Sequence, residues 1–118
     1  MPHAEPLGTQ RLDVPCGHGG AVTPHVHAGT PGGCAECLAS GSRWVHLRLC
    51  LTCGHVGCCD SSPERHATGH FHATRHPLMA SWEPGEGWGW CFVDEVDFDA
   101  RPVLREAHAA ARGGPGAS

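Results

Sequence analysis

This chain of 118 residues contains no Lys, Asn, Ile or Tyr and only 3 Phe. Val, Leu and Phe together supply 19 residues, and a chain with less than roughly 20% of large apolar side chains has difficulty building a hydrophobic core. The 17 Gly and 10 Pro also oppose long helices and strands. A domain of this size therefore needs stabilisation beyond apolar burial.

Other absences exclude whole classes of protein. No apolar run approaches the ~20 residues of a membrane span, and the net charge of −4 is unlike the basic surface of a nucleic-acid-binding protein. Residues 1–10 have neither the basic nor the apolar segment of a secretory signal, so we expect a cytoplasmic protein. We also expect it to be soluble and monomeric. The four missing residue types have the codons richest in A and T, which indicates a GC-rich bacterial genome.

Cysteine and histidine are abundant, with 8 and 11 residues. Histidine binds metals but adds nothing to a disulfide framework, and a reducing compartment disfavours disulfides. Two Cys-x-x-Cys pairs lead a series of eight donors, a spacing typical of closed structural zinc sites with four ligands each. Two such ions, each contributing on the order of 10 kcal/mol to folding, would take the place of a core. The eight donors are Cys34, Cys37, Cys50, Cys53, Cys58, His66, His70 and His76.

The pattern along the chain predicts a leader at 1–13, a folded domain at 14–99, and a short helix with a loose tail at 100–118. Residues 43–49 alternate as a half-buried strand does, and residues 61–74 start with the Ser and Pro63 signals of a helix. A turn follows the first Cys-x-x-Cys pair at residues 40–42. We expect further strands at residues 78–82 and 88–98, the latter as one strand or two, and a helix at residues 102–112.

The donor order, followed by His76-Pro77 and by Trp90-Cys91-Phe92, resembles the UBP-type zinc finger of ubiquitin-specific proteases and related proteins. The resemblance covers roughly residues 15–98. It implies an α+β fold, a small zinc-stabilised twisted antiparallel sheet with a packed helix. It also implies interleaved sites: Cys34, Cys37, Cys58 and His66 on zinc A, and Cys50, Cys53, His70 and His76 on zinc B.

Spacing alone leaves a second pairing open. His66 and His70 lie four residues apart on the predicted helix, so both side chains could bind the same ion.

The resemblance also implies a third zinc. Relatives with three ions hold the third with a Cys-x-His near the start of the domain and a Cys-x-x-Cys near its end. Here Cys16-Gly-His18 matches the first half, and Asp94 replaces the last thiolate after Cys91. Carboxylate is an acceptable zinc ligand. In the alternative, Cys91 and Asp94 lie on opposite faces of a continuing strand and no third ion binds.

Many relatives hold the C-terminal Gly-Gly of ubiquitin in an aromatic cleft with an Arg on the terminal carboxylate. Trp90 and Phe92 match that cleft and would share a strand face with Trp88, unless they only pack against the helix. Where relatives carry the Arg, two residues after Cys58, this chain has Asp60, and Arg48 stands in place of a cleft Trp. A carboxylate repels a carboxylate, which argues against ubiquitin-tail binding.

We therefore expect a zinc-binding module that binds a peptide or protein tail and is not an enzyme. The alternatives are a zinc-dependent hydrolase, which the His-x3-His spacing suggests, and a zinc-storage protein that uses the surplus histidines. A zinc peptidase needs Glu after its first His, where Ala67 stands here, and four ligands on each ion leave no open position for catalysis. Six acidic residues between positions 83 and 99, with no basic residue among them, would attract a cationic partner: Glu83, Glu86, Asp94, Glu95, Asp97 and Asp99.

Overall fold

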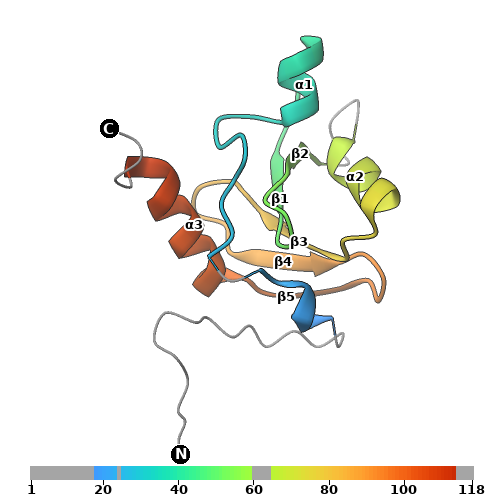
Figure 1. Ribbon diagram of the computed structural model, residues 1–118, viewed down its shortest axis with the longest axis vertical. Helices are drawn as coiled ribbons and strands as arrows, with labels where there is room; N and C mark the ends of the chain where they lie inside the picture. Colours follow the sequence, from blue (N-terminus) through green and yellow to red (C-terminus); the bar gives the residue numbers. More distant parts are fainter. Residues whose placement is uncertain (1–17, 24, 60–64, 114–118) are drawn as a thin grey trace, which may run out of the picture.

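The computed structural model describes residues 18–23, 25–59 and 65–113 (Figure 1). No helix in these ranges is long and apolar enough to cross a membrane. The predicted leader lies outside them. In chain order the elements are the 3-10 helix η1 (Gly19–Ala21), α1 (Ala35–Ser40), β1 (Leu47–Cys50), β2 (Val56–Cys58), α2 (His66–Thr74), β3 (Leu78–Ser81), β4 (Trp88–Cys91), β5 (Val96–Asp99) and α3 (Arg101–Gly113).

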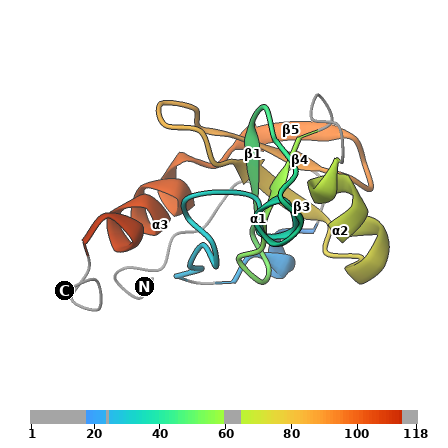
Figure 2. The same cartoon turned by 90° about the horizontal axis from the view of Figure 1, so that it is seen from above.

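All five strands form one antiparallel sheet in the order β2-β1-β3-β4-β5. Helix α2 packs against β1 and β2, and α3 lies at the other end of the sheet (Figures 1 and 2). Leu47 and Leu49 are buried on one face of β1, while Arg48 between them lies on the opposite face and is half-buried. The predicted α+β class is confirmed.

The hydrophobic core continues directly into the cysteine clusters. Leu49, Leu51 and Leu78 are fully buried in it, and α3 adds Val103 and Leu104. From the sequence, metal was expected to take the place of a core. This expectation was too narrow, because an apolar core exists and several cysteines are part of it. The buried cysteines in this cluster are Cys34, Cys37, Cys58 and Cys91.

Several predicted elements are confirmed. Strand β3 lies within residues 78–82, and α3 covers the predicted helix at residues 102–112. The segment predicted at residues 88–98 forms two strands, β4 and β5, and β5 extends one residue further, to Asp99. Because α3 contributes Val103, Leu104 and Ala107 to the core, it packs on the same body as the sheet. The predicted division of the chain near residue 99 stays a prediction.

Other predictions were wrong in detail. The strand predicted from residue 43 begins only at Leu47, and β2 was not predicted at all. The first Cys-x-x-Cys pair opens the short helix α1, because the Cys34 sulfur caps it by accepting a hydrogen bond from the Cys37 N–H at 3.4 Å. Gly41, at φ 78°, ends that helix in the left-handed conformation that glycine tolerates.

Helix α2 also begins later than predicted. Its first residue is His66, because Arg65 adopts a left-handed conformation (φ 48°, ψ 49°) that a helix cannot pass through. The predicted start at Ser61 and Pro63 lies outside the described residues. At the other end Arg75 is again left-handed, and its N–H donates to the Phe71 carbonyl. The helix is therefore short and begins at a candidate metal ligand.

Candidate metal centres and an aromatic groove

The first cluster joins four elements of the chain at one point. Cys34 precedes α1, Cys37 lies within α1, Cys58 ends β2 and His66 starts α2. The Nδ1 atom of His66 lies 3.2 Å, 3.4 Å and 3.5 Å from the sulfur atoms of Cys34, Cys37 and Cys58. The four donor atoms all lie within 4.8 Å of one another, and the three cysteines are buried.

Burial makes the thiols of this cluster hard to ionise without a cation. Desolvation raises the pKa of the Cys37 thiol to about 12, and the neighbouring Cys34 and Cys58 groups add to the rise. Burial likewise raises the pKa of Cys34. Zinc binds the thiolate form, so it would supply the charge that three buried sulfur atoms need. This donor set fits a structural zinc ion.

The second cluster is built from the end of β1, the turn after it, α2 and the segment that follows α2. The Cys53 sulfur lies 3.3 Å from Nε2 of His70, and the Cys50 sulfur lies 3.6 Å from Nδ1 of His76. All four donor atoms lie within 4.8 Å of one another. Desolvation is the main cause that lowers the pKa of His70, which favours the neutral imidazole that binds metals.

The turn that shapes the second cluster requires a glycine. Gly54 follows Cys53 with φ 84°, and a Cβ atom at this position would lie 1.9 Å from the His27 carbonyl oxygen. The Gly54 N–H also donates to the Cys50 carbonyl at 2.9 Å. The glycine thus allows the turn after Cys53 to lie directly against the His27 backbone.

A third cluster contains His18, Cys91 and Asp94. The Nδ1 atom of His18 lies 3.5 Å from the Cys91 sulfur and 3.8 Å from a carboxylate oxygen of Asp94. The Asp94 N–H donates to the Cys91 sulfur at 3.4 Å, so the chain turns after Cys91 instead of continuing as a strand. Cys16, the fourth predicted ligand, lies outside the described residues.

The donor atoms of the eight central residues thus fall into the interleaved arrangement, and His66 and His70 belong to different clusters. The six cysteines of the three clusters are free thiols. Thiolate and imidazole in sets of four are what a structural zinc ion prefers. Cys59, the seventh cysteine in the described part of the chain, is buried and lies outside the three clusters.

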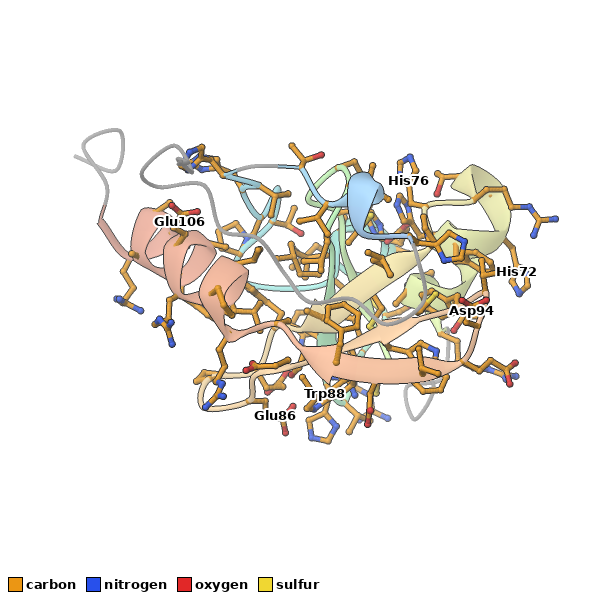
Figure 3. All side chains as sticks on the ribbon, turned by 90° about the horizontal axis from the view of Figure 1, so that it is seen from below. His72, His76, Glu86, Trp88, Asp94 and Glu106 are labelled. Atoms are coloured by element: carbon orange, nitrogen blue, oxygen red, sulfur yellow. The ribbon has the colours of Figure 1, made fainter. Side chains whose placement is uncertain are left out.

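One histidine that sequence analysis did not single out lies between the first two clusters. His55 contacts Glu36 at 2.8 Å, and its ring stacks on His70 with 4.1 Å between the centroids. It is therefore not one of several scattered surface histidines. Only the positions of the two residues could have indicated this contact: Glu36 lies inside one Cys-x-x-Cys pair, and His55 lies two residues after the other pair. By contrast, His72 is exposed at the outer edge of α2 (Figure 3).

A groove of about 330 Å³ lies between α2 and the sheet. Trp88, Trp90 and Phe92 line it together, as their alternation in the sequence predicts, and Met79 pairs with Trp90 across the strands. Trp88 projects from the sheet in Figure 3. The described residues lining the groove are Arg48, Cys59, Ala67, Thr68, Met79, Trp88, Trp90 and Phe92.

Two contacts shape the ends of this groove. The guanidinium carbon of Arg48 lies 4.5 Å from the Trp88 ring centroid, and an Arg48 N–H donates to the Leu47 carbonyl at 2.9 Å. Phe92 stacks on Phe71 of α2 with 4.7 Å between centroids, so part of its surface serves packing. Asp60, predicted to face the same ligand, lies outside the described residues.

The model of a family described as the zinc finger in ubiquitin hydrolases and other proteins matches residues 34–102. The chain belongs to the UBP-type zinc finger family. The chain is also similar to a solved structure, the solution NMR structure of protein RPA1320 from Rhodopseudomonas palustris, with 56% sequence identity and a TM-score of 0.68. The match covers 76% of this chain and 86% of that one. No curated protein matches this UBP-type zinc finger. Membership in this family and the Cys/His clusters make the chain a zinc-binding module.

Proposed function

We propose that this UBP-type zinc finger is a non-catalytic module that binds a peptide or protein tail, on a scaffold held by two or three zinc ions. Zinc A would be held by Cys34, Cys37, Cys58 and His66, and zinc B by Cys50, Cys53, His70 and His76. His18, Cys91 and Asp94, together with Cys16, would hold a third ion. The convergence of these donor atoms within 4.8 Å supports the assignment for the described residues.

When bound, zinc supplies a covalent-like crosslink between segments that are distant in sequence. The protein's own side chains arrange the rest. In the first set, the backbone N–H of His66 donates to the Cys58 sulfur at 3.1 Å and the Cys37 N–H donates to the Cys34 sulfur. Such hydrogen bonds orient the ligands and neutralise part of the thiolate charge.

The absence of catalysis is part of the proposal. A catalytic zinc keeps one coordination position for water or substrate, whereas each of the two central ions is offered four protein donors. Ala67 follows His66 where a zinc peptidase has its Glu base, and its side chain is buried. These observations favour a structural role for both ions.

The groove between α2 and the sheet is the observation on which peptide binding rests. Its three aromatic side chains offer flat apolar surfaces to an extended chain, and β4 holds Trp88 and Trp90 in place by pairing with β3 and β5. Among the described residues lining the groove, Arg48 is the only charged one. It would attract an acidic group of the ligand toward β1.

The opposite rim of the groove has the opposite charge. Asp97 pairs with Trp90 across β4 and β5, so the two side chains share a face of the sheet, and Asp97 is exposed. Arg48 and Asp97 therefore lie at opposite sides of the aromatic surface. A peptide with a basic residue near β5 and a carboxylate near β1 fits this distribution.

A display library of random peptides with free C-termini tests the proposal. We expect the wild-type protein to enrich a family of related peptides that Trp90→Ala no longer retains. Leu38→Ala is the matched control, because Leu38 is 55% exposed on α1 and does not line the groove. Failure of the wild type to enrich any sequence, or equal retention by Trp90→Ala, would contradict the assignment of the groove.

A further inference from the structure

A hydrogen bond connects the first zinc cluster to the turn of the second. Nε2 of His55 lies 2.8 Å from both carboxylate oxygens of Glu36, which sits between Cys34 and Cys37. A carboxylate at neutral pH only accepts hydrogen bonds, so Nε2 of His55 is the donor in this contact.

The other side of the same imidazole contacts the second cluster. The rings of His55 and His70 are nearly parallel, at 5°, with centroids 4.1 Å apart. His70 provides the Nε2 atom that lies 3.3 Å from the Cys53 sulfur. Flat stacking fixes the plane of the His70 ring, and with it the direction in which Nε2 points.

His55 itself is held firmly. Its side chain is only 16% exposed, and its carbonyl accepts a hydrogen bond from the Cys50 N–H at 2.8 Å. The latter contact closes the turn that carries Cys50 and Cys53. A rigid imidazole that touches both clusters can transmit order from one to the other.

We infer that His55 is a positioning residue that couples the two zinc centres, so that filling one favours filling the other. The inference rests on the zinc assignment proposed above. Filling the first centre orders the turn at Cys34 and Cys37 and thereby fixes Glu36. Glu36 then holds His55, which orients His70 before the second ion arrives. By reciprocity, filling the second centre favours the first.

Cadmium-113 NMR measures this coupling directly, since the first set has three thiolates and one imidazole while the second has two of each. Their signals are distinct, and Cd²⁺ is a soft ion that thiolates bind well. In a titration of the metal-free chain with less than one equivalent per site, we compare the intensity of the first signal with that of the second. Uncoupled sites fill in order of affinity, whereas coupled sites fill together.

In His55→Ala, we expect the intensity of the first signal divided by that of the second to rise at least about fivefold. A factor of five is the lower end of typical coupling between sites. His55→Phe keeps a stacking ring but loses the link to Glu36, and Glu36→Ala removes the same link from the other side, so both should behave like His55→Ala. The variant that combines His55→Ala with Glu36→Ala should show the same ratio as His55→Ala alone. His72→Ala is the control, because His72 lies on α2 with His70 but is exposed. The ratio of the two signals in this variant should equal that of the wild type.

Two results would overturn the inference in distinguishable ways. A ratio in His55→Ala and Glu36→Ala equal to that of the wild type, with both signals present at saturation, would show that the centres exist but that His55 does not couple them. A wild-type protein that lacks one of the two signals at saturation would contradict the zinc assignment itself. His55→Phe guards against misfolding, because it keeps the ring that fills the space beside His70.

Discussion

His66 and His70 lie one turn apart on α2, yet their metal-binding nitrogens belong to different clusters: Nδ1 of His66 faces three cysteines, and Nε2 of His70 faces Cys53. A single helical turn thus stands between the two candidate ions. Displacing α2 would disturb both clusters and the aromatic groove that Ala67 and Thr68 help to line. The candidate metal sites and the proposed peptide-binding groove therefore depend on the same short helix.

We expect native mass spectrometry of freshly purified protein to find two or three zinc ions per chain, held tightly because closed sites exchange slowly. If the third ion binds, Asp94→Ala should reduce a count of three to two. A count of one or none would contradict the eight-ligand assignment, and a count of two that Asp94→Ala leaves unchanged would exclude the third site.

Removal of the zinc with a chelator should unfold the domain. Three buried thiols border the apolar core, and without a metal that site loses the crosslink between α1, β2 and α2. Cys37→Ser removes a ligand of the first site and Cys53→Ser a ligand of the second. Each substitution should likewise unfold the domain. The measurement is the dispersion of amide signals in a heteronuclear NMR spectrum, and a chelated sample that keeps its dispersion would show that the apolar core suffices.

Peptides that end in Gly-Gly with a free carboxylate should bind weakly, because Asp60 stands where relatives have an Arg. Asp60→Arg should improve the affinity by about 10- to 150-fold, which corresponds to the roughly 1.5–3 kcal/mol of a charge-assisted hydrogen bond. Titration calorimetry of both forms provides the test, with Asp60→Arg combined with Trp90→Ala as the control that removes the aromatic surface. Micromolar binding of a ubiquitin tail by the wild type would contradict the prediction.

His108→Phe should stabilise the protein by roughly 1 kcal/mol. The His108 ring stacks on Trp82 with 3.9 Å between centroids, and its Nε2 is buried without a hydrogen-bond partner among the described residues. Phenylalanine would keep the stacking and remove the unpaired nitrogen. A melting temperature equal to or below that of the wild type at neutral pH would contradict this.

The same variant tests a pH dependence. Burial, and then the charge of Arg112, lower the pKa of His108, so the unfolded chain binds a proton at a higher pH than the folded one. Stability from this residue is complete above the ordinary histidine pKa of about 6.5 and is lost as the pH falls below it. Thermal melts between pH 7.5 and 5 should therefore show a smaller loss for His108→Phe than for the wild type.

The ligand clusters were easier to predict than the elements that carry them. Cys-x-x-Cys spacing, His76-Pro77 and the alternation of Trp88, Trp90 and Phe92 are local patterns whose chemistry survives errors of a few residues in an element boundary. The start of α2 was missed because the left-handed conformation of Arg65 has no signal in its residue type. Strand β2 was missed because three residues, Val56–Cys58, are too short to show alternation.

The role of His55 was inaccessible from sequence for a different reason. Its contacts with Glu36 and His70 span 19 and 15 positions along the chain and arise only when β1, β2 and α2 come together. Similarly, the stacking of Arg48 on Trp88 depends on β1 and β4 lying on either side of β3. Long-range pairing of strands decides such contacts, and a single sequence does not encode it in any local pattern.

Strand β5 is an outer strand of the sheet, and its two exposed residues are Asp97 and Asp99. Exposed outer strands invite a second chain to pair with them, and charged side chains are a common protection against such aggregation. Hydrogen bonds from Arg101 lower the pKa of Asp99 to about 2, so its carboxylate keeps its charge even in mildly acidic solution. Pairing with a second chain would have to desolvate the exposed Asp97 carboxylate and the Asp99–Arg101 ion pair, which should keep the protein dispersed at concentrations where a neutral strand would begin to form fibrils.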